Sequence, residues 1–306
     1  MVRFVLRRAL SLFGVLFCVV TVTFFLIHLM PGGPFDRERK LPEQVEAQLR
    51  AKYRLDGPIL AQYANYLGDL ARGDLRLSTK YRNRSVNEIL ADALPVSATL
   101  GGIAFALAVT AGVAFGSLAA SARQPWIDRT VMLLALVAIC LPSFVIGPLL
   151  ILLLSFTIPL LPVGGWGDAR SLILPSITLA APYAAYIARL TRASMLEVLG
   201  QDFVRTARAK GLSNFSVVCR HALRVGILPV VSYLGPLAAN LLTGSIVVES
   251  IFSIPGAGGF FVNSVLNRDG FLLAGVVIVY CTLLVVFNLA VDLLYGVLDP
   301  RIVLYE

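Results

Sequence analysis

The stretch RLTRASMLEVLGQDFVRTARAKGLSNFSVVCRHALR, residues 189–224, separates two long uncharged runs and decides how the rest of the chain is interpreted. It carries seven Lys or Arg residues and two acidic residues. A basic, helix-forming segment of this length between apolar runs is typical of a loop on one face of a membrane protein. We expect this loop to present a surface to a partner.

The composition supports a membrane protein. The 306 residues are 58% hydrophobic, above the roughly 45–50% of soluble domains. The net charge of +8 is attributed to cytoplasmic loops of a membrane protein rather than to nucleic-acid binding. The cysteines Cys18, Cys140, Cys219 and Cys281 lie far apart in the sequence, so no disulfide framework or metal site is expected.

A membrane-spanning helix needs about 20 mostly apolar residues. Six segments meet this requirement and predict an all-α, polytopic membrane protein in which residues 1–306 form one transmembrane domain: 9–30, 95–120, 130–154, 171–190, 225–248 and 271–293. The first segment is expected to be a retained helix, because it exceeds the usual apolar core of a signal peptide and lacks an A-x-A site. Small residues of the second segment, including Gly112 and Gly116, favour close helix packing within the subunit or across an interface.

The short loops predict the orientation. With the N-terminus in the cytoplasm, the cytoplasmic segments carry thirteen Lys or Arg residues and the short outer loops carry two, Arg170 and Arg268. This asymmetry predicts that both termini lie inside. Residues 31–92 and 249–270 would then be extracytoplasmic. Within the first of these loops we expect helices at 41–53 and 59–70, separated by a turn at Asp56-Gly57-Pro58.

The basic loop, 193–224, predicts two helices joined by a sharp turn. Residues 193–210 favour a helix, with Met195, Val198, Leu199, Phe203 and Ala207 along one stripe. Gly211 suits a left-handed residue after the helix, and Ser213 suits the N-cap of a second helix at 214–223. A basic amphipathic pair could lie on anionic lipid, but an exposed Gly-Leu-Ser turn favours docking to a protein.

The sequence resembles the permease subunits of ABC importers, specifically the B-type permease of the dipeptide/oligopeptide branch. The resemblance covers nearly the whole chain. It rests on the following segments: LRR at 6–8, PGGPF at 31–35, LPVSATL at 94–100, PSF at 142–144, ARLTRASMLEVL at 188–199, RTARAKGL at 205–212, ESIFSIPGAGGFFVNSVLNRD at 249–269 and NLAVDLLYGVLDPRI at 288–302.

In this family the basic loop inserts a short coupling helix into a cleft of an ATPase subunit. The general importer motif is EAA, three residues, Gly, nine residues and I-x-L-P. Aligned on Gly211, this chain departs from it, with RTA at 205–207 and HALR at 221–224. The resemblance implies that the following residues contact the ATPase: Asp202, Arg205, Thr206, Ala207, Lys210, Gly211, Leu212 and Ser213.

The resemblance also implies the partners. The chain would form half of the pathway of an ATP-driven oligopeptide importer in the bacterial inner membrane. It would work with a second homologous permease, two ATP-binding subunits, an extracytoplasmic peptide-binding protein and membrane lipid, and with no nucleic acid. The sequence has no G-x-x-x-x-G-K-[ST] loop. ATP and Mg would therefore be held by the partner ATPases, and this subunit is expected to be neither an enzyme nor a cofactor carrier.

Two further sets of residues are candidates. A glycine-rich outer loop is expected to act as a gate or scoop near the docked binding protein: Pro255, Gly256, Gly258, Gly259, Arg268 and Asp269. Polar residues in the expected spans are candidates for lining the pathway, or for simple helix packing: Tyr183, Tyr186, Asn240, Thr243 and Ser245.

Other function classes stay open at this point. A secondary carrier, or a receptor whose basic loop binds lipid, are alternatives, as are dipeptides, murein peptides, glutathione or nickel as cargo. A proton-coupled carrier would need carboxylates or histidines across the membrane. Only His28 lies inside an expected span, while Glu249 and Asp292 lie at span ends, where we expect them to reach water. This pattern argues against a carrier.

Overall fold

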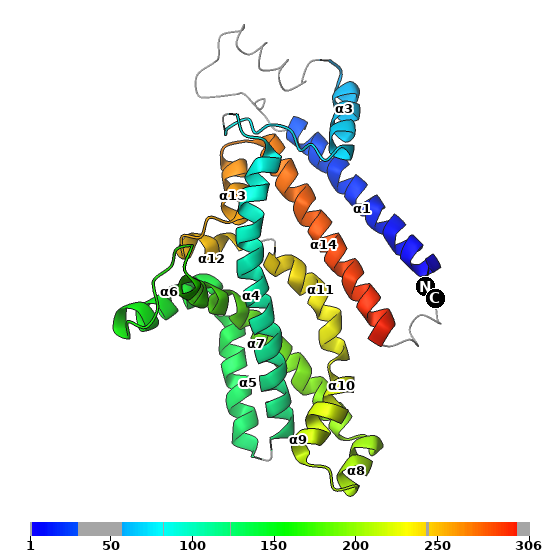
Figure 1. The fold of residues 1–306 in the computed structure, drawn as a ribbon, viewed down its shortest axis with the longest axis vertical. Coiled ribbons are helices and arrows are strands. Elements are labelled where there is room, and N and C mark those ends of the chain that lie inside the picture. The colour runs from blue at the N-terminus through cyan, green and yellow to red at the C-terminus, as the bar shows by residue number, and fades with distance from the viewer. Residues whose placement is uncertain (1, 30–56, 82, 123, 243–244, 299–306) are drawn as a thin grey trace. The chain divides into compact units, whose positions relative to one another are not determined.

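The computed structural model describes residues 2–29, 57–81, 83–122, 124–242 and 245–298. Those residues are mostly helical, with one isolated bridge between Leu77 and Ser85 (Figure 1). The chain divides into two compact units. The smaller combines residues 1–96 with 256–285, and the larger combines 97–255 with 286–306. The expected helix at 41–53, the segment 31–35 and Thr243 lie outside the described residues.

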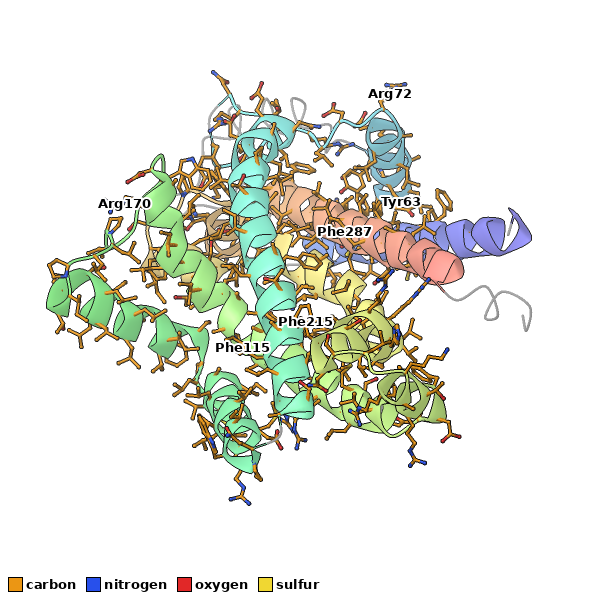
Figure 2. The ribbon with its side chains drawn as sticks, turned by 60° about the horizontal axis from the view of Figure 1, so that its bottom comes forward. Tyr63, Arg72, Phe115, Arg170, Phe215 and Phe287 are labelled. Atoms are coloured by element: carbon orange, nitrogen blue, oxygen red, sulfur yellow. The ribbon has the colours of Figure 1, made fainter. Side chains whose placement is uncertain are left out.

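The larger unit is built from long apolar helices. It contains α4 (Val86–Ser121) from residue 97 onward, α5 (Pro125–Cys140), α6 (Ser143–Ile151), a π-helical turn (Leu152–Thr157), a 3-10 turn (Ala169–Leu172), α7 (Ile173–Leu199), α11 (Leu228–Leu242) and α12 (Ile246–Ile251). Large apolar side chains cover the outside of several of these helices. On α4 they include Phe115, which is labelled in Figure 2 and is about half exposed.

Helices α4 and α7 pack closely through glycine. A Cβ atom at Gly112 would lie 2.7 Å from the carbonyl oxygen of Ala184 and 2.6 Å from Cβ of Ile187. One at Gly116 would lie 2.5 Å from the carbonyl oxygen of Ala188. Small residues allow helix backbones to approach in this way. These two glycines therefore pack within the subunit, which is the first of the two interpretations of the small-residue pattern.

The third expected span differs from a single straight helix. The range 130–154 falls on α5 and α6, whose axes are bent by 108° at the break between Cys140 and Ser143. Leu141 is extended, with φ −82° and ψ 122°, because the residue before a proline is disfavoured in the helical region. Pro142 is also extended. The two residues therefore redirect the chain, and Pro142 is the sequence signal for the bend.

Among the described residues, four helices are long and apolar enough to cross a membrane, or five if the bent pair counts as one. The four cover Val86–Ser121, Ala169–Leu199, Leu228–Ile251 and Gly270–Ala290. A shorter apolar segment, Phe13–Leu29, lies within α1. The count of six spans and the N-in/C-in orientation stay predictions.

The smaller unit contains α1 (Val2–Leu29), α3 (Ile59–Ala71), the start of α4, α13 (Ala257–Leu266) and α14 (Gly270–Leu298) up to residue 285. Helix α3 confirms the helix predicted at 59–70. It packs through Tyr66 against Val20, Phe24 and Ala274. A second core joins the start of α4 to α14 and contains Val86, Ile89, Leu90, Phe271, Leu272 and Val276.

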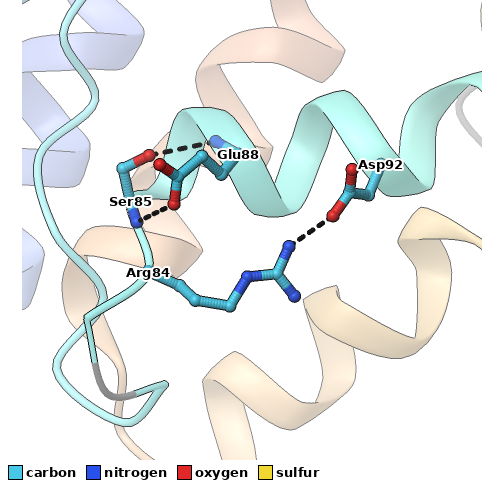
Figure 3. A network of polar contacts seen from close by, with 4 residues as sticks. All are labelled: Arg84, Ser85, Glu88 and Asp92. Carbon is cyan, nitrogen blue, oxygen red and sulfur yellow. Dashed lines mark hydrogen bonds and ion pairs between the residues drawn. The ribbon is translucent and has the colours of Figure 1, made fainter.

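The start of α4 is fixed by a capping box (Figure 3). The Glu88 backbone N–H donates to Ser85 Oγ at 3.1 Å, and the Ser85 N–H donates to Glu88 Oε2 at 3.0 Å. Arg84 forms an ion pair with Asp92 one further turn along. A capping box satisfies two backbone donors that a helix start leaves open. Helix α4 therefore begins at Val86, nine residues before the span expected from residue 95.

Candidate functional site

The basic loop forms a compact element that we call the elbow: α8 (Asp202–Ala209), the turn at 210–213, α9 (Asn214–Ser216), a π-helical turn (Val217–Ala222) and α10 (Leu223–Gly226). Figure 1 shows it at the end of the larger unit remote from α6. The prediction of one continuous helix at 193–210 is wrong, because two helices share this segment. Residues up to Leu199 continue α7, and Gln201 is extended, with ψ 155°.

The turn of the elbow has the geometry predicted from its sequence. Gly211 has φ +77°. Its N–H donates to the carbonyl of Arg208 at 2.9 Å, and the Leu212 N–H donates to the carbonyl of Ala207 at 3.4 Å. These two bonds form a Schellman motif. Ser213 Oγ then accepts from the Ser216 N–H at 3.3 Å, as an N-cap does. The structure therefore confirms both the left-handed glycine and the cap.

The elbow is held against the end of α7 by its own apolar core. The core consists of Met195, Val198, Val204, Ala207, Val217, Val218 and Ala222. The predicted stripe is wrong at Phe203, which is 40% exposed, whereas Val204 is fully buried. The interruption at Gly200 and Gln201 separates α7 from α8, so the spacing of one continuous helix does not extend to Phe203. Ala207 lies in this core, so its side chain packs inside the elbow and is not part of the exposed surface.

The outer surface of the elbow combines cations with exposed apolar groups. Seven of the eight predicted coupling residues are exposed, namely Asp202, Arg205, Thr206, Lys210, Gly211, Leu212 and Ser213. Arg205 lies 3.5 Å from Asp202, with both side chains largely in solvent, so the pair contributes little stability. Phe215 is 78% exposed (Figure 2). It lies beyond the segment predicted to make the contact, which ends at Ser213, so the sequence analysis missed it. An aromatic residue two positions after the N-cap was the available signal.

Two of the candidate gate residues lie in helix α13, and the other four lie in the segments that flank it. Gly256 is the N-cap residue of α13, and Gly258 and Gly259 lie in its first turn. Asp269 is completely buried at the start of α14. It accepts hydrogen bonds from the hydroxyl of Ser78, from the Thr79 N–H at 3.2 Å and from the Leu272 N–H at 3.2 Å. Asp269 therefore anchors a loop and caps a helix, while Arg268 and Pro255 are exposed.

Among the described candidate lining residues, Tyr183 and Tyr186 lie on α7, Asn240 lies on α11 and Ser245 precedes α12. Asn240 donates through Nδ2 to the hydroxyl of Tyr183 at 3.2 Å. The rings of Tyr186 and Tyr233 lie 4.7 Å apart between centroids, which adds Tyr233 to the predicted set. Ser245 caps α12, because its Oγ accepts from the Val248 N–H at 3.4 Å. Four of these side chains are thus brought together in pairs, whereas Ser245 has a local role.

Glu249 corrects an expectation. It is only 2% exposed rather than in contact with water, and its Oε1 accepts a hydrogen bond from Ser97 Oγ at 2.7 Å. Phe252, three residues further on, is also buried, and its carbonyl accepts a hydrogen bond from the Gly165 N–H at 2.8 Å. Within the described part of the chain, His, Cys, Asp and Glu side chains form no group of three that could hold a metal ion.

Comparison with known proteins identifies the family. The family described as "Binding-protein-dependent transport system inner membrane component" matches residues 112–304, and its N-terminal companion matches residues 1–101. The chain belongs to this permease family. The permease is therefore a multi-pass protein of the bacterial inner membrane.

Individual relatives agree along the whole length of the permease. It is 47% identical over 304 residues to the oligopeptide transport system permease protein OppB of Escherichia coli K12, covering 99% of each chain. It is 41% identical over 306 residues to the dipeptide transport system permease protein DppB of Bacillus subtilis, covering 100% of this chain and 99% of the other. A chain of the MetNI methionine ABC transporter, solved in inward-facing conformations, aligns with a TM-score of 0.59 at 15% identity. That alignment covers 69% of this chain and 96% of the other, and it shows the shared fold.

Proposed function

We propose that this permease is one transmembrane half of an ATP-driven oligopeptide importer, with six spans and both termini in the cytoplasm. The full-length similarity to a protein named as an oligopeptide permease supports oligopeptides as the class of cargo. The dipeptide permease at 41% identity makes dipeptides the second candidate cargo. Uptake of labelled peptides of graded length, by cells with and without this gene, separates the two. Equal uptake in both strains for every length would refute the proposal.

In this proposal the elbow receives force from an ATPase subunit. Its core ties it to the end of α7, so a push on α8 moves a long helix of the larger unit. Its exposed surface offers Arg205, Arg208 and Lys210 for charge pairing and Phe215 as an apolar anchor. Exposed aromatic residues rimmed by polar groups are common at protein–protein contacts. We propose that the predicted contact residues other than Ala207 make this contact, and their exposure supports that role.

The rest of the assembly follows from the same proposal. A second homologous permease completes the pathway, two ATPase subunits bind ATP and Mg, and an extracytoplasmic protein delivers the peptide. The permease itself performs no chemistry and carries no cofactor. Lipid surrounds its apolar outer faces. Pro255, Gly256, Gly258, Gly259 and Arg268 remain candidates for a contact with the delivery protein, and Asp269 would hold that region in place from within.

Charge reversal on the elbow tests the coupling. The double variant Arg205→Glu, Lys210→Glu and the single variant Phe215→Asp should abolish co-purification of the ATPases and ATP-dependent uptake, while membrane levels stay unchanged. The control is Arg72→Glu, which makes one Arg-to-Glu charge reversal at an exposed site of the smaller unit, labelled in Figure 2. Full uptake by the elbow variants would rule out the proposed coupling surface.

A further inference from the structure

Helix α11 has an exposed face unlike that of the other long helices. Its exposed residues are Pro229, Ser232, Pro236 and Asn240, spaced three, four and four residues apart along one stripe. No large apolar side chain of α11 is among the exposed ones. By contrast, α5 exposes Leu133, Leu134, Leu136 and Val137. A face that meets acyl chains carries apolar groups, because unsatisfied polar groups are costly in hydrocarbon. The stripe on α11, which has a hydroxyl, an amide and no large apolar side chain, therefore suits contact with water or protein better than contact with acyl chains.

Aromatic residues of α7 lie beside this stripe. Tyr183 accepts the 3.2 Å hydrogen bond from Asn240, and Tyr186, itself 47% exposed, lies against the ring of Tyr233. We call these four residues the phenol–amide ledge. A phenol that accepts a hydrogen bond retains its own hydrogen to donate. The ledge thus presents neutral donors and acceptors together with flat aromatic surface.

The chemistry of the ledge suits a peptide main chain. Residues 173–188 of α7 and all of α11 carry no charged side chain, so the surface neither selects nor repels a charged cargo side chain. Amide and phenol groups match the N–H and C=O groups that every peptide shares, while the rings can contact varied apolar side chains. A neutral ledge therefore allows contact with many peptides of different sequence.

A second permease is the competing occupant of this face. Helix–helix interfaces in membranes favour small residues that let backbones approach. Tyr186 is instead a half-exposed aromatic residue beside this face, which favours a transient solute over a closely packed helix. We propose that the phenol–amide ledge contacts the main chain of the peptide during transit. This inference rests on the proposed import function and adds the residues that touch the cargo.

Site-directed photocrosslinking tests the ledge in the native assembly. The photoreactive residue p-benzoylphenylalanine replaces Ser232 or Tyr186 in the full-length permease, in cells supplied with a biotinylated oligopeptide. Position 134 on α5 is the matched control, since Leu134 is 64% exposed. We expect ATP-dependent capture of the peptide at 232 and 186 and none at 134. In the position 232 background, Asn240→Leu should reduce capture about fivefold, as expected for one lost neutral hydrogen bond.

The possible outcomes distinguish failure of the ledge proposal from failure of the proposed import function. Adducts at 232 and 186 to a second membrane protein, or to phospholipid, would overturn the ledge, and so would an absence of peptide adducts in cells that import the peptide. Peptide capture at 134 equal to that at 232 would also overturn it, because labelling would then not depend on the face. If the unmodified permease imports no peptide, the proposed function itself fails.

Discussion

Replacing Gly211 with alanine should loosen the elbow by a predictable amount. Gly211 has φ +77°, and a Cβ atom there would meet nothing within 4 Å. The substitution therefore has no steric clash with neighbours and acts through the backbone alone. The left-handed conformation costs an L-residue about 1–2 kcal/mol. Alanine also restricts the unfolded chain, which offsets about 0.4–1 kcal/mol. The net loss is about 1 kcal/mol.

This loss should appear where the Schellman bonds open. The amides of Gly211 and Leu212 are held by the carbonyls of Arg208 and Ala207. A loss of about 1 kcal/mol in the local opening free energy accelerates hydrogen exchange about fivefold. Hydrogen-exchange mass spectrometry of the peptide covering α8 and the turn measures this directly. Asparagine tolerates the left-handed region better than alanine, so Gly211→Asn should exchange more slowly than Gly211→Ala.

A matched control distinguishes backbone strain from loss of any glycine. Gly259 also has open space around a new Cβ, and its φ is not left-handed. Gly259→Ala should therefore leave exchange in α13 unchanged or slower. If Gly211→Ala leaves the exchange of its turn as slow as in the unchanged protein, the left-handed glycine does not stabilise the elbow and the reasoning fails.

Three further perturbations test the packing. Gly112→Val should prevent the close approach of α4 to α7 and cost about 3 kcal/mol or more, because backbone must move. Gly102→Ala, where the nearest neighbour of a new Cβ lies at 3.9 Å, should be tolerated, and equal thermal stability of the two variants in detergent would contradict this. Asp269→Ala should remove the carboxylate that accepts from the Ser78 hydroxyl and from the Thr79 and Leu272 N–H groups, costing about 3 kcal/mol and making residues 78–81 sensitive to protease. Resistance equal to that of the unchanged protein would refute the anchor. Burial raises the pKa of Tyr66 to about 12, so the neutral phenol favours the fold. The smaller unit should lose about 2 kcal/mol as pH rises from 10 to 12, and Tyr66→Phe should remove that loss in thermal unfolding scans.

Local sequence chemistry predicted the parts that depend on a few neighbouring residues. Gly211 and Ser213 specify a turn through backbone preference and a side-chain oxygen, so their geometry could be inferred without tertiary contacts. The long apolar runs likewise predicted where the long helices lie, because such runs can be recognised without tertiary contacts. The role of the elbow as an ATPase contact came from resemblance and stays a proposal.

Tertiary contacts account for what the sequence did not reveal. Glu249 looked accessible because it ends an apolar run, yet it is buried and accepts a hydrogen bond from Ser97, 152 residues earlier. Asp269 looked like part of a glycine-rich gate, but it binds the loop at 78–80 across 191 residues. The break at Gly200 depends on how α8 packs onto α7. Such pairings are not encoded in any single window of sequence.

Because of the bend between α5 and α6, the fit of this permease in the bilayer depends on the thickness of the membrane. The 16 residues of α5 rise about 24 Å, which is less than the roughly 30 Å of a typical hydrocarbon core. Since α6 departs at 108°, it adds little further depth. A short span of this kind is accommodated by thinning of the bilayer, by snorkelling of flanking residues or by association with a neighbouring subunit. A change in lipid chain length should therefore affect α5 more strongly than the longer α4.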